Sequence, residues 1–397
     1  MPRYWPNESE TIALLYDAHS EGQDRPQAAP ISVTSVWQMD SPQAADSAMG
    51  GKDARFVYRR DGHPNERRLA DKLVKLHGGA HAIITAQGMS SIAAVAMSVL
   101  KSGSSVWIAN ELYGKSSRLF ADLHKWGLLV RAFDPTHEAD IQSLANANAD
   151  LVLVETISNP TTGVADLSRI VGAGHAAGAL VMVDNTFATH LLCRPIELGA
   201  DIVVESLSKI VCGHSDSMLG LVVTKDSELG ASIRNTVSTF GLASSPLDCY
   251  LTERGLMTLA LRMERACENA SAIARLLSSS QLVTRVDYPG LESHPHHEQA
   301  KRQFGTPCGW MLAFELNHKS LSVEQFFERS RPEIAFVPSL GDVCTTLSHP
   351  RSTSHRSLTS EQLVELGISE STIRISCGIE PTAWLLERFR VSLRAGV

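Results

Sequence analysis

A lysine, two hydroxyls and a carboxylate follow apolar stretches of this chain at spacings that allow shared chemistry. Ser206, Ser208 and Lys209 come directly after the apolar run 200–204, and Asp184 ends an earlier apolar run. A lysine amine can hold an aldehyde as a Schiff base, hydroxyls can bind a phosphate, and a carboxylate can pair with a pyridinium nitrogen. These groups together predict a site for pyridoxal 5′-phosphate (PLP), with Lys209 as its anchor.

Further candidates follow other expected strands. Gly88 and Met89 stand between a strand and a helix, where backbone N–H groups bind phosphate. The ring of Tyr113 is suited to stacking on a pyridine ring, the amide of Asn159 to its phenolic oxygen, and the fork of Arg374 to a substrate carboxylate. Taken singly, each of them is better explained by a turn, a core or surface tyrosine, or an ion pair. Their common place at strand ends favours the site.

The elements that position these residues alternate along the chain. Apolar runs predict strands, and helical segments separate them. Unbroken apolar strands of this kind indicate a mostly parallel sheet with helices on both faces, whose ligands bind at the carboxyl ends of the strands. The expected strands are 82–85, 105–109, 151–155, 179–183 and 200–204.

A chain of 397 residues is too long for one compact core. We expect an N-terminal arm over residues 1–60 and a large α/β domain over residues 61–255. Residues 256–397 predict a smaller α+β domain, with a long helix over 255–280 followed by strand-like segments.

Composition excludes several classes of protein. Hydrophobic residues make up 43% and charged residues 20%, as in globular proteins, and the net charge of −7 without a basic block argues against nucleic acid as a partner. No apolar run approaches a membrane span, and the N-terminus lacks the apolar core of a signal peptide. Seven scattered cysteines predict reduced thiols, and so a cytoplasmic location.

Two motifs invite other interpretations. The histidine-rich segment 294–297 resembles a metal cluster, but its spacing is wrong for helical ligands, and a solvated helix start is the simpler expectation. The glycine-containing segment 213–216 lies just past Lys209 and is expected to form a wall of the cofactor pocket. No metal is predicted.

At this point the chain resembles the Cys/Met-metabolism family of fold-type I PLP enzymes, which includes cystathionine γ-synthase, cystathionine γ-lyase and methionine γ-lyase. The resemblance runs from about residue 30 to the C-terminus. The segments that carry it are Tyr58–Asn65, Gln87–Met89, Tyr113–Ser116, Ser206–Asp216, Arg254–Leu259, Tyr288–Pro295, Ser339–Gly341 and Arg374–Glu380.

The resemblance implies roles for the residues at the cofactor ring. Lys209 would bind PLP covalently and then move protons between substrate carbons. Asp184 would keep the ring nitrogen protonated, and Tyr113 would stack on the ring and assist proton transfer. The fold implied is that of fold-type I PLP-dependent transferases.

It also implies the remaining binding residues. The phosphate would be bound by Gly88, Met89, Ser206 and Ser208. Tyr58 and Arg60 would reach the phosphate of a neighbouring subunit, so the chain would form dimers, and a dimer of dimers is expected. The substrate and the cofactor oxygen would be oriented by Asn159, Ser339, Arg374 and Arg118.

The implied activity is γ-replacement of the cystathionine γ-synthase kind, on a small sulfur amino acid or an O-acylated homoserine. Elimination by a carbon–sulfur lyase stays open, as does a PLP-binding scaffold with little turnover. Two departures from the family pattern bear on this choice. Pro338 stands where many members carry a glutamate, and Lys115 replaces a small residue.

Overall fold

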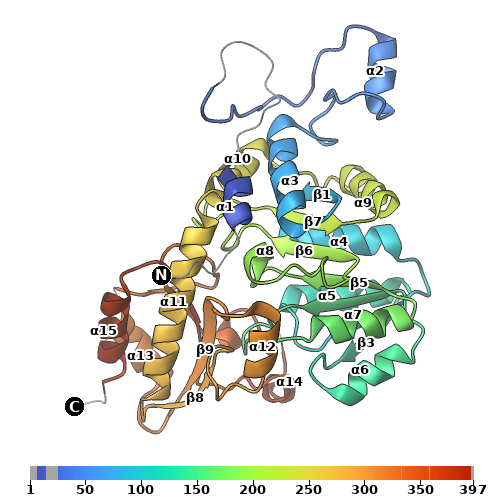
Figure 1. Ribbon diagram of the computed structural model, residues 1–397. Coiled ribbons are helices and arrows are strands. Elements are labelled where there is room, and N and C mark those ends of the chain that lie inside the picture. The colour runs from blue at the N-terminus through green and yellow to red at the C-terminus, as the bar shows by residue number, and fades with distance from the viewer. Residues whose placement is uncertain (1–6, 15–25, 332, 357, 395–397) are drawn as a thin grey trace.

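The computed structural model describes residues 7–14, 26–331, 333–356 and 358–394. Most of the chain folds around two β-sheets, one of seven strands and one of five (Figure 1). The predicted α/β architecture with a mostly parallel sheet is confirmed. In the part of the chain that the structure describes, no helix is long and apolar enough to cross a membrane.

The larger sheet has the strand order β1-β7-β6-β5-β4-β2-β3. Only β7 runs against the others, since it pairs antiparallel with both β1 and β6. The three central strands are almost wholly buried, as their unbroken apolar sequences require. The bounds are β1 (His81–Thr85), β2 (Ser105–Ala109), β3 (Leu129–Phe133), β4 (Leu151–Glu155), β5 (Leu180–Asp184), β6 (Ile202–Ser206) and β7 (Gly220–Thr224).

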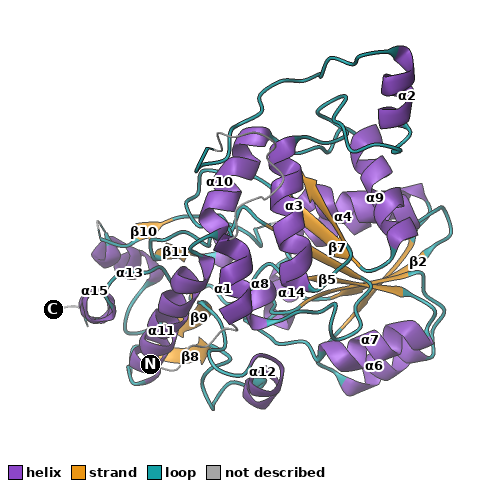
Figure 2. Cartoon of the chain, turned by 45° about the horizontal axis from the view of Figure 1, so that its top comes forward, coloured by secondary structure: helices purple, strands orange, loops and turns teal. Residues whose placement is uncertain are grey.

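Helices cover both faces of this sheet, with α6 and α7 on one side and α4 and α9 on the other (Figure 2). Their bounds are α3 (Pro64–His77), α4 (Gly88–Val99), α5 (Gly114–Leu123), α6 (Glu138–Ala145), α7 (Leu167–Ala176), α8 (Thr189–Leu192), α9 (Ser227–Thr239) and α10 (Pro246–Leu256). Gly78 ends α3 in the left-handed conformation, with φ 68°, that glycine adopts without strain.

Register brings the ends of the central strands level. Glu155 at the end of β4 is the partner of Asp184 at the end of β5. Asp184 in turn is the partner of Val204, two residues before the end of β6. Parallel strands end on the same edge of a sheet, so the polar residues that follow them meet there.

The five-stranded sheet belongs to the C-terminal part, in the order β10-β11-β12-β9-β8. Its strands are β8 (Val283–Asp287), β9 (Met311–Leu316), β10 (Ala335–Phe336), β11 (Thr346–Ser348) and β12 (Thr372–Ser376). The helices of this part are α11 (Leu259–Ser278), α12 (His297–Phe304), α13 (Val323–Ser330), α14 (Ser360–Glu365) and α15 (Thr382–Ser392).

The long helix α11 connects the two hydrophobic cores. Leu259 and Met263 near its start pack in the core of the larger sheet. Ile273 and Leu277 near its end pack in the core of the smaller sheet. The helix therefore fixes the two sheets relative to each other, and with them the residues that each sheet contributes to one site.

The structure departs from the expected elements in places. The long helix expected over 255–280 is α11, but it begins at Leu259, because α10 ends at Leu256 and Met257 and Thr258 separate the two helices. The strands β3 and β7 were not expected, although β7 separates β1 from β6. Both follow glycine-containing or polar segments that hide the start of the strand from a pattern of hydrophobicity.

Two helices lie in the described part of the first 60 residues, and they differ in how they contact the rest of the chain. The helix α1 (Asn7–Leu14) packs on the body, where the carbonyl of Ala13 accepts a hydrogen bond from Lys72 Nζ at 3.0 Å. The helix α2 (Pro42–Met49) stands out from the rest at the end of an extended segment (Figure 1).

Candidate cofactor and substrate site

A cavity of about 500 Å³ lies where the carboxyl ends of β4, β5 and β6 face the C-terminal part of the chain. Both parts contribute to its wall, because Ser339 and Arg374 come from beyond α11. Ten of the predicted site residues line it: Gly88, Met89, Tyr113, Asn159, Asp184, Ser206, Ser208, Lys209, Ser339 and Arg374.

Lys209 stands in the turn after β6 and points its amine at the C-terminal part. Its Nζ donates a hydrogen bond to Ser339 Oγ at 3.1 Å. Burial, and then the positive charge of Arg374, lower the pKa of the Lys209 amine below its ordinary value. A lowered pKa raises the fraction of neutral amine, which is the form that attacks an aldehyde or takes a proton from carbon.

One carboxyl oxygen of Asp184 accepts two hydrogen bonds from Thr186. Its Oδ1 accepts hydrogen bonds from the backbone N–H of Thr186 at 3.0 Å and from the Thr186 hydroxyl at 2.6 Å. Thr186 Oγ1 also accepts from the backbone N–H of Ser206 at 2.9 Å, which ties the ends of β5 and β6 together. Burial raises the pKa of Asp184, whereas the bonds from Thr186 oppose that rise. The carboxyl group is thus oriented and ready for a cationic partner.

The start of α4 has the form of a phosphate cradle. Gln87 precedes the helix, and its side chain makes no capping hydrogen bond. The first N–H groups of α4 can therefore donate to a ligand. A Cβ at Gly88 would lie 2.8 Å from the Cβ of Ser206, so only glycine lets this helix start approach β6 so closely. The hydroxyl of Ser208 is engaged by the backbone of Leu219.

Arg374 is a buried cation on β12, with 3% of its surface exposed. Its guanidinium donates to Asn159 Oδ1 at 2.9 Å and to the carbonyl of Ser339 at 3.2 Å, while its Nε has no partner. Burial lowers the pKa of Arg374 to about 10. No carboxylate of the described residues pairs with this charge. A buried cation of this kind favours an anionic ligand, such as a carboxylate.

Tyr113 begins α5 at the rim of the cavity, with 41% of its surface exposed. Its backbone N–H donates to Glu155 Oε1 at 2.6 Å. The ring is accessible from the cavity and is therefore free to stack on a planar ligand.

Three predicted residues do not line the cavity of this chain. Arg118 lies on an exposed face of α5, where its Nε bonds to Asp122 Oδ2 at 2.8 Å. Tyr58 and Arg60 lie on the segment that follows α2, with the Arg60 guanidinium 5.1 Å from the centre of the Tyr58 ring. Of the two departures from the family pattern, Pro338 lines the cavity and Lys115 does not.

Sequence reasoning missed Glu155 as a site residue. It lines the cavity, it is buried, and it ends an apolar strand as Asp184 does. That shared position was the signal that identifies it in the sequence.

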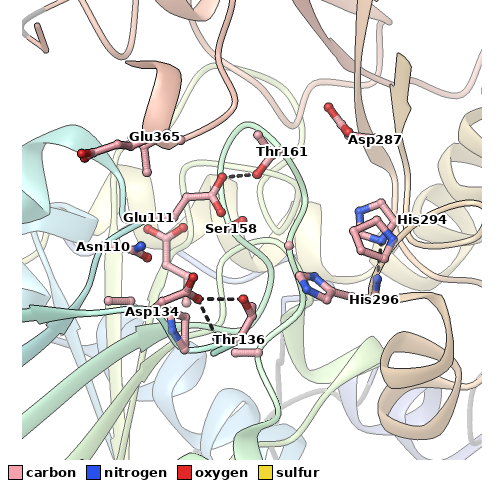
Figure 3. Close-up of a pocket in the computed structure, with 17 residues that line it drawn as sticks. Asn110, Glu111, Asp134, Thr136, Ser158, Thr161, Asp287, His294, His296 and Glu365 are labelled. Atoms are coloured by element: carbon pink, nitrogen blue, oxygen red, sulfur yellow. Dashed lines mark hydrogen bonds between the residues drawn. The ribbon is translucent and has the colours of Figure 1, made fainter. Parts of the chain in front are cut away.

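Glu155 also lines a second, smaller cavity of about 170 Å³, and Figure 3 shows residues of this cavity. Glu111 and Asp134 line it from the larger sheet, and Asp287, His294 and His296 from the C-terminal part. A helix does start at these histidines, since α12 begins at His297, but the segment is not solvated throughout, because only 5% of the surface of His294 is exposed. The Nδ1 of this buried imidazole accepts the N–H of His296 at 3.1 Å. Among the described residues no cluster has the makings of a metal site.

Comparison with known proteins agrees with this geometry. The sequence pattern of the family described as "Cys/Met metabolism PLP-dependent enzyme" matches residues 10–394. The chain is 34% identical to an L-methionine gamma-lyase of Porphyromonas gingivalis, over 89% of each chain. It is 36% identical to a cystathionine beta-lyase of Lactococcus lactis, over 92% of this chain and 93% of the other.

A solved structure is similar over nearly the whole length. The cystathionine gamma synthase of Xanthomonas oryzae pv. oryzae, in complex with aminoacrylate and cysteine, superposes with a TM-score of 0.92. Its sequence is 35% identical, and the match covers 98% of each chain.

Proposed function

The chain belongs to the Cys/Met metabolism family of PLP-dependent enzymes, and we propose that within this family it catalyses γ-replacement, joining a thiol to the carbon skeleton of an O-acylated homoserine. The cofactor, the enzyme class and a role in transsulfuration chemistry follow from the family. The particular reaction and the role of each residue are the proposal.

The observation that carries the proposal is the arrangement of Lys209, Ser339 and Arg374. A lysine amine whose pKa is lowered by burial, the hydroxyl that accepts its hydrogen bond and a guanidinium with no carboxylate partner among the described residues share one cavity. An α-amino acid carries a carboxylate for the guanidinium and places its Cα near the amine. The similarity to the Xanthomonas oryzae cystathionine gamma synthase supports γ-replacement as the outcome.

The site has the groups that PLP needs. Its aldehyde would be bound by Lys209, its ring nitrogen by Asp184, its phosphate by the start of α4 with Met89, Ser206 and Ser208, and its phenolic oxygen by Asn159. When bound, PLP withdraws electrons from the bonds at the substrate α-carbon. Asp184 supports that withdrawal, because a carboxylate at the ring nitrogen favours the protonated ring.

Residues of this chain would carry out the proton transfers. With PLP and an amino acid bound in the cavity, the amine of Lys209 would be the group that takes the proton from Cα and moves protons at Cβ. The phenol of Tyr113 assists by proton transfer at the substrate amine or at the leaving group. Arg374 fixes the carboxylate, and this orients the Cα–H bond toward Lys209.

A second candidate is elimination by a carbon–sulfur lyase. The similarity to L-methionine gamma-lyase and to cystathionine beta-lyase favours it. Pro338 lines the cavity where many family members carry a glutamate. That glutamate is tied to the choice between γ-replacement and elimination, and proline has no ionisable group to take its place.

Product analysis separates the candidates. Purified enzyme would be incubated with O-succinylhomoserine plus cysteine and, separately, with cystathionine alone. We expect cystathionine to form in the first mixture, with little 2-oxoacid. Release of 2-oxoacid and thiol from cystathionine, without synthesis in the first mixture, would assign the enzyme to elimination. A protein that binds PLP yet turns over neither would fit the scaffold alternative.

We also propose that the active unit is a homodimer, in which Tyr58 and Arg60 of one chain reach the phosphate site of the other, and that two dimers associate. Both residues lie on an extended segment away from their own cavity, and 43% of the Tyr58 surface is exposed. All seven cysteines are free thiols, which supports a reducing, cytoplasmic location as part of the proposal.

A further inference from the structure

Glu155 occupies a place that no other described residue shares. It lines both the cavity that holds Lys209 and the smaller cavity of Figure 3. Only 9% of its surface is exposed. In the sheet it is the direct partner of Asp184 on the neighbouring strand. A buried carboxyl group beside another buried carboxyl group is costly, so what it contacts is informative.

One contact of Glu155 fixes the backbone of Tyr113. Its Oε1 accepts the Tyr113 N–H at 2.6 Å. Tyr113 immediately precedes α5, and its carbonyl accepts N–H groups of the first turn of that helix. The Glu155 carboxyl group therefore sets both where α5 begins and where the Tyr113 ring enters the cavity.

The second consequence concerns charge. Two negative charges at Glu155 and Asp184 would repel each other in a buried setting, so the pair favours a single charge. Asp184 accepts two hydrogen bonds from Thr186, whereas Glu155 accepts one from Tyr113. More donors stabilise an anion better, so the charge settles on Asp184 and the proton on Glu155.

The groups around Glu155 also favour its protonated form. Burial raises the pKa of Glu155 well above its ordinary range, and the charges of Asp184 and then Glu111 add to that rise. Asp184 faces it from β5, and Glu111 from the segment after β2. No lysine or arginine of the described residues is among the groups that shift it.

We infer that Glu155 is a positioning residue, which in its protonated form holds Tyr113 against the cofactor ring and leaves the negative charge to Asp184. The inference rests on the proposed placement of Tyr113 at the ring. It adds to that site a residue that acts through Tyr113 and Asp184.

The test compares three substitutions that separate shape from charge. Glu155→Gln keeps the acceptor oxygen and the length but cannot ionise. Glu155→Asp keeps the acid but is one methylene shorter, and Glu155→Ala removes the group. Each holoenzyme is measured by the visible circular dichroism of bound PLP and by the PLP dissociation constant. Glu365→Gln is the matched control, since Glu365 borders only the smaller cavity.

We expect Glu155→Gln to keep the dichroic band and a dissociation constant within about threefold of the parent. The Asp and Ala variants should weaken the band and raise the dissociation constant about tenfold, the effect of about one lost hydrogen bond. Glu365→Gln should match the parent. An uncharged isostere that rescues where the shorter acid fails is a pattern that a general structural role would not produce.

Other outcomes overturn the inference. A Gln variant as impaired as the Ala variant would show that the ionised carboxylate is required. An Asp or Ala variant with parental dichroism and affinity would show that Glu155 positions nothing. If the Ala variant does not accumulate, the comparison of Gln with Asp decides alone. Tyr113→Ala is measured alongside: an unchanged band there would refute the placement of Tyr113, whatever Glu155 does.

Discussion

The guanidinium of Arg374 is buried, and not all of its hydrogen-bond donors have a partner. Its bonds go to an amide oxygen of Asn159 and a carbonyl of Ser339, and its Nε has no partner. Neutral acceptors do not balance a buried charge as a carboxylate does. A ligand that supplies a carboxylate would complete this site, as an α-amino acid does.

We predict that Arg374→Lys lowers kcat/KM by about ten-fold to a hundred-fold, because hydrogen bonds to charged groups are worth about 1.5–3 kcal/mol and lysine lacks the planar fork. The loss should be similar for every amino-acid substrate, since all carry the α-carboxylate. Steady-state kinetics with two substrates measure it, and the absorbance of bound PLP is the control. A variant that loses PLP, or that changes only side-chain preference, would place Arg374 in another role.

Most individual site residues were predictable because strand ends are visible in the sequence. Lys209, Asp184 and Ser206 follow apolar runs directly, and the fold brings those ends to one edge. Arg118 was expected to bind substrate because its motif matched that of the family. On α5, however, its side chain points away from the cavity and bonds to Asp122. Helical phase, which decides that direction, was not determined by the motif.

At the scale of elements, a histidine caps the helix that leads into the larger domain. His63 precedes α3, and its Nδ1 accepts the N–H of Glu66 at 3.1 Å. Its Nε2 lies 3.1 Å from Ser244 Oγ, which itself donates to Glu66. The cap needs an unprotonated Nδ1, and burial accordingly lowers the pKa of His63 to about 4.

This cap predicts a pH dependence of stability. In the unfolded chain His63 binds a proton near its ordinary pKa of 6.5, whereas in the folded chain its pKa is about 4. The contribution of the cap to the free energy of unfolding is therefore complete above pH 6.5 and is lost as the pH falls toward 4. Replacing His63 by Asn retains a capping oxygen that does not titrate. We expect the melting temperature of His63→Asn to fall less steeply than that of the parent between pH 6.5 and 4. Parallel curves for the two proteins would contradict the assignment.

Elements were predictable where an apolar run is unbroken, as at Ser105–Ala109 and Leu151–Glu155, which the structure reproduces. The split between α10 and α11 was not visible, because helical periodicity continues through the break at Met257. Leu256 before the break and Leu259 after it both pack in the core of the larger sheet, so the pattern of burial does not mark the break.

At the scale of the whole molecule, the site combines both parts of the chain, and the proposed dimer would add a second chain. Tyr58 and Arg60 follow α2, the helix that stands out from the rest in Figure 1, and neither residue lines the cavity of its own chain. The expectation that Tyr58 and Arg60 reach a partner comes from the family resemblance alone, since the pattern of hydrophobic residues along one chain carries no such signal.

We predict that Tyr58→Ala and Lys209→Ala variants, each inactive or weak alone, regain part of the parental activity when mixed and reassembled. In a mixed dimer one of the two sites receives Lys209 from one chain and Tyr58 from the other. Activity after mixing, compared with each variant reassembled with itself, measures this. A fully active monomer in sedimentation analysis would rule out the shared site.

The most direct test of the account is chemical. Borohydride reduction of the purified holoenzyme fixes PLP to the amine that holds it, and peptide mass analysis then locates the modified lysine. The account predicts loss of the visible absorbance, a single modified peptide that contains Lys209, and no such bond in Lys209→Ala. A reduced cofactor on another lysine, or a PLP adduct that survives in Lys209→Ala, would contradict it.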